Sequence, residues 1–326
     1  MTKDAAHPLH DEAAAVQFYE DRYSGHYMED WTPEVKSRIV NLIRELDLPS
    51  SGEALDFGCG NGTMTAVLRQ ALGSGWKIYG SDISSVAVNN ARKRFPDCTF
   101  FAANDPQFAG KKFDFLFTHH VLEHVSALDD IVAQIDARLK PRAAMLHILP
   151  CGNEGSLEHR VAQLRRDGID PTLGNRFFFE DEGHLRRLRS DELEELFTPI
   201  GFRLAHAAFR NQEHGALDWM TQSPPAVIRK IVDLSEAKGP EERKELAPLR
   251  RRLLFWWALR YPSFFVTSRI THRRRSLRDI VLGLAALPLF PVSKLAERYI
   301  TWRAAREWAT RRHERNGSEM FLFLKR

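Results

Sequence analysis

The stretch ALDFGCGNG at residues 54–62 decides the fold of this 326-residue chain. Its first residues read as a short apolar strand, and glycines follow at every second position, at Gly58, Gly60 and Gly62. A strand that passes through a glycine-rich turn into a helix exposes backbone N–H groups to a ligand without obstruction by side chains. Thr63 stands where a dinucleotide-binding turn requires a third glycine. The stretch therefore predicts a nucleoside-binding turn and argues against a pyrophosphate cradle.

Short apolar strands alternate with helices on both sides of this turn. We predict strands at 54–58, 76–83, 98–105, 113–120 and 143–150, and helices at 33–47, 63–71, 84–95 and 125–139. Such alternation is typical of an α/β fold in which helices cover both faces of a Rossmann-like, mostly parallel sheet. Ligands of these folds lie at the carboxyl ends of the strands.

The alternation stops after residue 150. A short helix at 157–166 and a loop that ends in Arg176 and three phenylalanines suggest a lid over the substrate at 151–181. A helix at 190–197, with Ser190 as its cap, leads to a strand at 202–209, and 319–324 reads as the closing strand. We predict an N-terminal helical cap (1–50), a core (51–215), a helical basic insertion (216–316) and the closing strand (317–326).

Composition limits the class of protein. The hydrophobic content of 43% supports a substantial core, and three scattered cysteines form neither a disulfide framework nor a C-x-x-C pair. These cysteines favour a cytoplasmic location, and the N-terminus lacks the features of a signal peptide. No run reaches the roughly 18 apolar residues that a membrane-spanning helix needs.

Basic charge is concentrated near the C-terminus. Residues 223–315 contain 21 Lys and Arg against 9 Asp and Glu, a net charge of +12, and the rest of the chain carries −8. Arginine triplets at 250–252 and 273–275 bracket apolar stretches at 253–266 and 280–292, and 294–315 places Leu295, Tyr299 and Trp302 on one helical face. We interpret 250–315 as a peripheral attachment to an anionic membrane surface on its inner face. A helical cap or dimer interface remains an alternative, nucleic-acid binding is disfavoured, and the oligomeric state stays open.

Two carboxylates follow the first two strands. Asp56 ends the first strand, where a carboxylate can hold a cationic group of a ligand, and an ammonium suits it better than a phosphate. Asp82 ends the second strand 20 residues after Gly62, where an acidic residue accepts hydrogen bonds from both ribose hydroxyls. Ile83 offers an apolar face for a purine. Together with the glycine turn, these residues predict a nucleoside cofactor.

The ordered motifs resemble the class I methyltransferases that use S-adenosylmethionine, particularly the bacterial group that modifies small molecules and lipids. The resemblance rests on ALDFGCGNG (54–62), GSDIS (80–84), Asn104-Asp105, FDFLFTHHVLEHV (113–125), RLKPRAAM (138–145) and EGHLRRLRSDELEELFTPIGF (182–202). Where the family usually has KPGG, this chain has Lys140-Pro141-Arg142-Ala143, so we expect a slightly different turn there. The resemblance covers about residues 50–210 and leaves the acceptor open.

The resemblance implies S-adenosyl-L-methionine as the cofactor and assigns residues to its parts. Asp56 and the three glycines would hold the methionine portion, Asp82 the ribose and Asp105 the adenine amino group. The predicted cofactor site also includes Ile83, Asn104, Thr118 and His119.

Histidines supply the candidate bases for transfer to a hydroxyl. His119 and His120 end the fourth strand, where neighbouring side chains point to opposite sides, so we expect one of them, His120, to face the acceptor. His184 is the other candidate base. Glu123 and His124 are expected to stabilise the strand-to-helix turn by hydrogen bonds. The spacing HVLEH differs from the zinc-binding H-E-x-x-H, so no metal is predicted.

The predicted reaction is transfer of a methyl group to a small-molecule or lipid-linked acceptor, with oxygen as the acceptor atom. Candidate acceptor-binding residues are Tyr19, Tyr23, Arg176 and Arg186. The alternatives are an inactive S-adenosylmethionine-binding protein and a methyltransferase that acts on a soluble metabolite or a nucleic acid. A nicotinamide-dependent reductase is disfavoured because the third glycine is missing.

Overall fold

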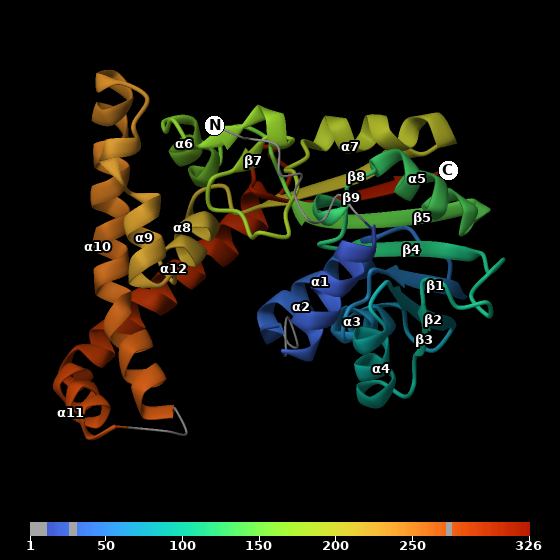
Figure 1. The fold of residues 1–326 in the computed structure, drawn as a ribbon, viewed down its shortest axis with the longest axis horizontal. Helices are drawn as coiled ribbons and strands as arrows, with labels where there is room; N and C mark the ends of the chain where they lie inside the picture. Colours follow the sequence, from blue (N-terminus) through green and yellow to red (C-terminus); the bar gives the residue numbers. More distant parts are fainter. Residues whose placement is uncertain (1–11, 26–30, 272–275) are drawn as a thin grey trace. The chain divides into compact units, whose positions relative to one another are not determined.

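The computed structural model, which describes residues 12–25, 31–271 and 276–326, contains a seven-stranded sheet (Figure 1). Its strands are β1 (Gly52–Phe57), β2 (Trp76–Asp82), β3 (Thr99–Ala102), β4 (Phe113–His119), β5 (Leu139–Pro150), β8 (Arg203–Arg210) and β9 (Glu319–Lys325). β1 pairs in parallel with β2 and β4, β2 with β3, and β4 with β5. Buried apolar side chains such as Leu55, Phe115 and Leu146 run along the central strands, as expected where both faces are covered.

The strand order β3-β2-β1-β4-β5-β9-β8 creates a topological switch point between β1 and β4. From β1 the chain proceeds to β2 on one side, whereas β4 and β5 extend the sheet on the other side. In sheets of this kind a crevice opens at the carboxyl ends of the two strands that flank the switch. The predicted fold class is confirmed, including the helical insertion before the last strand.

Helices pack beside this sheet. They are α1 (Glu12–Ser24), α2 (Pro33–Glu45), α3 (Thr63–Leu72), α4 (Ser85–Arg94), α5 (Leu128–Ala137) and α7 (Ser190–Phe197), with short 3-10 turns at η2 (Leu122–His124) and η4 (Thr198–Ile200). The start of α2 follows from its sequence, because Thr32 accepts a hydrogen bond from the Val35 N–H and Pro33 is the first helical residue. Its residues Ile39 and Ile43 are buried on one face.

Several predicted element ends are wrong. The fourth strand ends at His119, and the helix expected from Val125 begins at Leu128, because η2 occupies the turn between them. Arg189, and not Ser190, is the cap of α7, since its backbone N–H donates to Oε2 of Glu192 at 2.7 Å. The turn expected at 140–143 is part of β5. α1 lies within the helical cap predicted at 1–50, but its bounds were not predicted.

The chain divides into two units. The first unit contains Met1–Pro150, Glu182–Ala207 and Met320–Arg326, and the second contains Cys151–Asp181 and Ala208–Glu319. The second unit holds α6 (Leu157–Gln163), β6 (Ile169–Asp170), η3 (Pro171–Leu173), β7 (Arg176–Phe177), α8 (His214–Met220), α9 (Pro225–Ile231), η5 (Leu234–Glu236), α10 (Pro240–Thr271), α11 (Leu277–Ala286), η6 (Leu287–Leu289) and α12 (Phe290–Arg311). The segment interpreted as a lid, 151–181, thus belongs to the same unit as the insertion.

Charged groups are buried within the second unit. The carboxylate of Glu307 is 5% exposed and accepts hydrogen bonds from the backbone N–H groups of Glu213, His214 and Gly215, where α8 begins. A negative charge at this end of a helix offsets its dipole and its unpaired N–H groups. The guanidinium of Arg165 lies 4.0 Å from the Phe178 ring centroid. The Glu307 contacts connect α12 to α8, and the contact of Arg165 with Phe178 lies within the segment at 151–181.

An apolar helical stretch runs without interruption from Ile280 to Arg311 through η6 into α12. Within the described residues, it is the one helix whose length and composition would allow it to cross a membrane, and 17% of its most apolar window is buried. The expectation that no apolar run is long enough to cross a membrane is therefore wrong for this helix. Pro288 and Pro291 do not end it, because each stands at the start of a helical turn, where a backbone N–H is not needed. The arginine triplet at 273–275, which was interpreted as part of the membrane attachment, lies outside the described residues.

Candidate functional site

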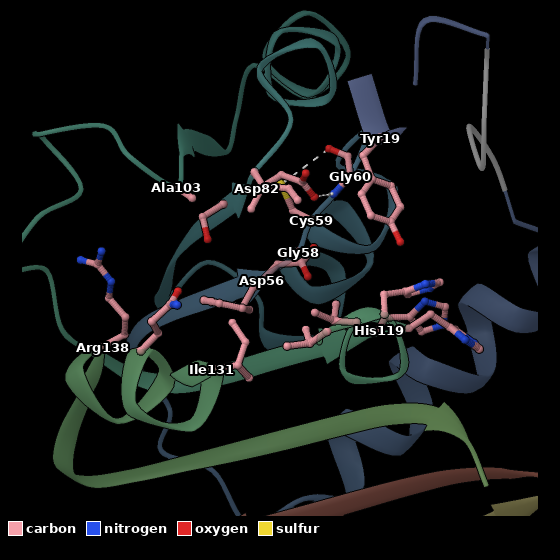
Figure 2. A pocket seen from close by; sticks show the side chains of 18 of the residues that line it. Tyr19, Asp56, Gly58, Cys59, Gly60, Asp82, Ala103, His119, Ile131 and Arg138 are labelled. Carbon is pink, nitrogen blue, oxygen red and sulfur yellow. Dashed lines mark hydrogen bonds between the residues drawn. The ribbon is translucent and has the colours of Figure 1, made fainter. Parts of the chain in front are cut away.

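A cavity of about 800 Å³ opens at the carboxyl ends of β1, β2 and β4, beside the switch point (Figure 2). Its walls combine the glycine turn with aromatic, acidic and histidine side chains: Tyr19, Tyr23, Trp31, Asp56, Gly58, Cys59, Gly60, Asn61, Asp82, Ile83, Phe108, His119, His120, His124, Ile131 and Arg138. Figure 2 shows Asp82 and the glycine turn on one side of this space, with His119 and Arg138 on others. All these residues belong to the first unit.

The glycine turn brings the backbone itself to the cavity. Gly58 and Gly60 have φ angles of 77° and 50°, a left-handed conformation that favours glycine. A Cβ atom added to Gly58 would lie 2.5 Å from Cγ2 of Val121, and one added to Gly60 would lie 2.8 Å from the Tyr23 hydroxyl oxygen. The absent side chains therefore let Val121 and the Tyr23 hydroxyl pack against the turn, while the backbone of both glycines lines the cavity.

Gly62 has a different role, because it lies outside the cavity lining and faces the packed side chains behind the turn. A Cβ atom there would lie 2.9 Å from Cβ of Ala91 and 3.0 Å from rings of Phe95 and Phe100. The resemblance assigned Gly62 to the cofactor, whereas its position indicates close packing between the turn and α4.

Substitution of Gly62 tests this packing role. Gly62 and Gly201 share nearly the same backbone conformation, with φ and ψ of 80° and 4° against 89° and 5°, but a Cβ at Gly201 meets nothing closer than 3.5 Å. Both alanine variants should lose about 1–2 kcal/mol of unfolding free energy from the left-handed conformation. Gly62→Ala should lose about a further 1–3 kcal/mol from overpacking, measured by urea denaturation. Equal losses in the two variants would show that the contacts behind Gly62 relax without cost.

Asp82 connects the end of β2 to the glycine turn. One carboxylate oxygen accepts a hydrogen bond from the Gly60 N–H at 2.8 Å (Figure 2), and the other accepts one from the Ser84 N–H at 2.9 Å. Burial raises the pKa of Asp82 above its ordinary value, and these backbone N–H groups act in the opposite direction. Each oxygen keeps a second lone pair, so the carboxylate can accept hydrogen bonds from two neighbouring hydroxyls of a ligand.

Asp56 is a second buried carboxylate at the cavity. Its Oδ2 accepts a hydrogen bond from the Thr65 hydroxyl at 2.6 Å. The pKa of Asp56 is raised to about 7, chiefly by burial. The hydrogen bond from Thr65 acts to lower this pKa, and the nearby Asp82 charge acts to raise it. A cationic group of a ligand beside this carboxylate would favour its ionised form.

Both neighbouring histidines line the cavity. The prediction that only one of them faces it is wrong, because β4 ends at His119 and His120 adopts a left-handed φ of 55°, which breaks the alternation of the strand. The ring of Trp31 contacts both: it meets His119 edge-on, with centroids 4.8 Å apart, and stacks on His120 at 5.9 Å. The two imidazoles thus share one aromatic wall.

Glu123 orients His120. Nδ1 of His120 lies 2.8 Å from Oε1 of Glu123, whose side chain is fully buried. Burial raises the pKa of Glu123, but the hydrogen bond from His120 and the charges of His120, His124 and His184 lower it to about 2. The carboxylate is therefore ionised at neutral pH, and it accepts a hydrogen bond from the Nδ1–H of His120.

The other candidate base, His184, and the candidate acceptor-binding residue Arg186 lie outside the cavity lining. The ring centroid of His184 is 4.7 Å from that of His124. The Arg186 guanidinium donates to the Ser126 carbonyl oxygen at 2.8 Å. His184 and Arg186 thus contact the loop at 124–126 on the side away from the cavity lining.

Four other residues that were predicted to bind the cofactor or the acceptor lie outside the cavity lining. The Thr118 hydroxyl pairs with Nδ1 of the buried His147 at 2.8 Å, on the opposite side of β4 from His119. Asn104 and Asp105 are outside the lining, and Asp105 accepts a hydrogen bond from the Gln107 N–H at 2.9 Å. Arg176 belongs to the second unit and donates to the Asp181 carbonyl oxygen at 2.9 Å.

Sequence reasoning missed several lining residues, above all Trp31 and Arg138. Trp31 stands next to the capping residue Thr32, and no local pattern marks it as part of a site. Arg138 follows α5, and its guanidinium lies 4.0 Å from the Phe108 ring centroid. Only the tertiary fold brings them to the cavity.

The donor and acceptor groups fit a nucleoside that carries an amino-acid chain. The Asp82 carboxylate suits ribose hydroxyls, the buried Asp56 carboxylate suits an ammonium group, and the turn at Gly58 and Gly60 offers backbone without side chains. Ile83 lines the cavity with 43% of its surface exposed, which leaves an apolar face for a base. S-adenosylmethionine contains each of these complementary groups.

The sequence of this chain is similar to those of known methyltransferases. A family model described as a methyltransferase domain matches residues 26–207. The trans-aconitate 2-methyltransferase of Paracidovorax citrulli is 26% identical over 145 residues, which cover 41% of this chain and 55% of that relative. The trans-aconitate 2-methyltransferase of Acidovorax sp. is 26% identical over 230 residues, 62% of this chain and 85% of the relative.

Among solved structures, the YcgJ protein of Bacillus subtilis is 16% identical, with a TM-score of 0.44 over 64% of this chain and 88% of that protein. This chain spans about half the length of most of the curated relatives that it matches. The family model, in contrast, covers more than half of this chain. The chain therefore belongs to the methyltransferase-domain family, as a class I member whose cofactor is S-adenosylmethionine.

Proposed function

We propose that this chain transfers the methyl group of S-adenosylmethionine to an oxygen atom of a small-molecule or lipid-linked acceptor, with His120 as the general base. The observation that carries this proposal is the 2.8 Å hydrogen bond between His120 and the buried Glu123 at the cavity wall. When bound, S-adenosylmethionine supplies an electrophilic methyl group on a sulfonium, which leaves as a neutral thioether. The protein then has to align the acceptor and remove its proton.

The cofactor half of the site is assigned to three features. The Asp82 carboxylate accepts hydrogen bonds from ribose hydroxyls, the Asp56 carboxylate faces the ammonium group, and Ile83 contacts the purine. The support is the burial of both carboxylates at the cavity and the hydrogen bond that joins Asp82 to Gly60. Asn104, Asp105 and Thr118, which the resemblance also implied, lie outside the described lining and are assigned no contact with the cofactor.

The pH dependence of cofactor binding tests the role of Asp56. Because the pKa of Asp56 is raised to about 7, this carboxyl is mostly protonated at pH 6 and mostly ionised at pH 7.5. Only the ionised form attracts an ammonium, and an α-amino group, with a pKa of about 7.7–8.0, stays mostly protonated up to pH 7.5. Affinity for S-adenosylmethionine should rise by about fivefold to tenfold from pH 6 to pH 7.5. Isothermal titration should show a flat profile for Asp56→Asn, and an unchanged slope would exclude Asp56 as the titrating group.

His120 is positioned to accept a proton. Since the ionised Glu123 carboxylate accepts the Nδ1–H of His120, the lone pair of the neutral imidazole lies on Nε2. Nε2 would take the proton of the acceptor hydroxyl as the hydroxyl oxygen attacks the methyl group that bound S-adenosylmethionine would supply, and the electron pair of the C–S bond would leave on sulfur. Stacking on Trp31 restrains the imidazole ring.

The acceptor half of the cavity favours an aromatic or apolar compound. Tyr19, Tyr23 and Trp31 supply ring surfaces, and Arg138 is the one arginine among the described lining residues. Arg176 and Arg186, two of the predicted acceptor-binding residues, donate to backbone carbonyls near them. These contacts favour an acceptor less anionic than the trans-aconitate for which two of the relatives are named.

The second unit supports a lipid-linked acceptor through an exposed apolar surface. On α11, η6 and the first turns of α12, the side chains of Val281, Leu284, Leu287, Leu289, Val292 and Leu295 are each at least 54% exposed, except Leu287 at 45%. Basic residues lie on the same segment, among them Arg278, Lys294 and Arg298. Exposed apolar patches of this kind are rare on monomers and mark binding surfaces. The combination suits the interface of an anionic bilayer.

A liposome flotation assay tests the membrane attachment. The chain should float with vesicles that contain anionic phospholipid at low salt, and less with neutral vesicles. A Leu284→Glu and Leu287→Glu double variant should stay at the bottom of the gradient, whereas Val227→Glu, on an exposed position of α9, should float like the parent chain. Failure of the parent chain to float would exclude the attachment, and resistance to alkaline extraction would indicate a spanning helix instead.

Methyl transfer itself is tested with a methyl-labelled donor. The chain is incubated with labelled S-adenosylmethionine and a lipid-plus-metabolite extract, and the labelled product is identified by mass. We expect an O-methylated product in the organic phase. Label on nitrogen or carbon would overturn the assignment of oxygen and of the base, and cofactor binding without any labelled product would indicate a binding protein.

A further inference from the structure

We propose that Glu123, His124 and His184 bind a divalent transition-metal ion at the edge of the cavity. Each residue offers one ligand atom, and these atoms all lie within 4.8 Å of one another. Glu123 and His124 come from η2, and His184 comes from the segment before α7, all within the first unit. Residues 60 positions apart thus converge on one point.

A buried oxygen of Glu123 supplies independent evidence for a ligand. The side chain is fully buried, and Oε1 takes the hydrogen bond from His120. Its other oxygen, Oε2, is buried and has no hydrogen-bond partner in the described part of the chain. Buried carboxylate oxygens are normally satisfied, because leaving one unpaired costs about 1–3 kcal/mol or more. A bound cation would satisfy this oxygen.

The orientation of His124 points the same way. Nδ1 of His124 lies 2.8 Å from the Gly183 carbonyl oxygen, and a carbonyl can only accept, so Nδ1 carries the proton. Nε2, 4.0 Å from Oε1 of Glu123, is then left with a lone pair in the neutral ring. The lone pair on Nε2 and the negative Glu123 carboxylate repel each other unless a positive charge lies between them. Ligating histidines typically donate their other N–H to a carbonyl or carboxylate in this way.

The donor set selects the class of ion. Two imidazole nitrogens and one carboxylate suit Zn²⁺, Fe²⁺ or Co²⁺, whereas Mg²⁺ and Ca²⁺ prefer oxygen ligands. Three protein ligands are also the number found in catalytic zinc sites, which leave one position open. Tetrahedral ligands about 2.1 Å from an ion stand about 3.4 Å apart, so the three side chains must draw closer on binding.

The open position would face the acceptor half of the cavity. His124 and its neighbours Val121 and Val125 line the cavity, and the Tyr19 ring lies edge-on to His124 with centroids 5.9 Å apart. An oxygen atom of the acceptor could therefore complete the coordination. This last step rests on the proposed function, whereas the binding of the ion does not.

Direct metal titration tests the site. The full chain, without a histidine tag and after treatment with a chelator, is titrated with Co²⁺ and followed by visible absorption. We expect one Co²⁺ per chain, displaced by Zn²⁺ but not by millimolar Mg²⁺. Glu123→Gln and His184→Gln should each weaken Co²⁺ binding by at least about 100-fold, since loss of mere supporting residues already costs 10–100-fold. His214→Gln, which alters a histidine–glutamate pair in the second unit, should bind as the parent chain does.

Two results would overturn the site: no saturable Co²⁺ or Zn²⁺ binding by the parent chain, or parent-like Co²⁺ affinity in His184→Gln. Because His184 lies outside the cavity lining, its variant should keep its affinity for S-adenosylmethionine, which serves as the check on folding. The titration needs neither cofactor nor acceptor. Metal binding without methyl transfer would therefore count against the proposed function alone, and methyl transfer without metal binding against the metal site alone.

Discussion

The Asp82→Ala variant should lose at least about 100-fold in affinity for S-adenosylmethionine. Two hydrogen bonds from ribose hydroxyls to a charged group contribute about 1.5–3 kcal/mol each, and every 1.4 kcal/mol is a tenfold change in affinity. The substitution also removes the acceptor for the Gly60 and Ser84 N–H groups, which hold the glycine turn against β2. Equilibrium dialysis with labelled cofactor measures the loss.

Two further variants make this result specific. Asp82→Asn keeps the size of the side chain and should bind with intermediate affinity, because one oxygen still accepts. Asp97→Ala removes an exposed carboxylate that pairs with Arg69, and its affinity should match that of the parent chain. Parent-like affinity in Asp82→Ala, with thermal unfolding unchanged, would mean that the ribose binds elsewhere.

The His120→Ala variant should lower kcat by about 100-fold to 10,000-fold, the usual contribution of a general base. Its affinity for the cofactor should change little, because the imidazole acts on the acceptor. Added imidazole should restore part of the rate at high pH. The measurement is initial velocity with the acceptor identified by labelling.

Two further variants distinguish the general base His120 from the neighbouring residues His119 and Glu123. His119→Ala leaves the pair of His120 and Glu123 in place and should lose less activity. Glu123→Gln should shift the pH profile of kcat, since the charge that orients and stabilises the protonated imidazole is gone. A larger loss in His119→Ala than in His120→Ala would assign the base to His119, and a change in KM alone would give His120 a binding role.

Local sequence was sufficient to predict the fold class and to place the glycine turn, Asp56 and Asp82 at the cavity, whereas the predicted cofactor residues Gly62, Asn104, Asp105 and Thr118 lie outside its lining. The alternation of strands and helices depends on hydrophobic periodicity, which each segment carries by itself. The turn at Gly58 and Gly60 and the carboxylate of Asp82 lie at strand ends, and parallel strands bring such ends together at one edge. These features could therefore be located without knowledge of distant contacts.

The acceptor half could be predicted only in part, through Tyr19, Tyr23 and His120, because the rest depends on distant segments and on individual backbone angles. Trp31 reaches His119 and His120 only through the folded chain, more than 80 residues along the sequence. The left-handed φ of His120 places two successive histidines at the cavity, against the alternation expected of a strand. Thr118, one residue earlier, still obeys that alternation and pairs with His147 on the other side.

Calorimetric titration of the parent chain with S-adenosylmethionine, and separately with NADH, tests the central assignment most directly. The glycine turn without a third glycine, Asp82 and Asp56 predict saturable binding of one S-adenosylmethionine per chain and no competition from NADH. NADH binding that displaces S-adenosylmethionine, or the absence of saturable heat with S-adenosylmethionine, would contradict the assignment of this cavity as the methyl-donor site.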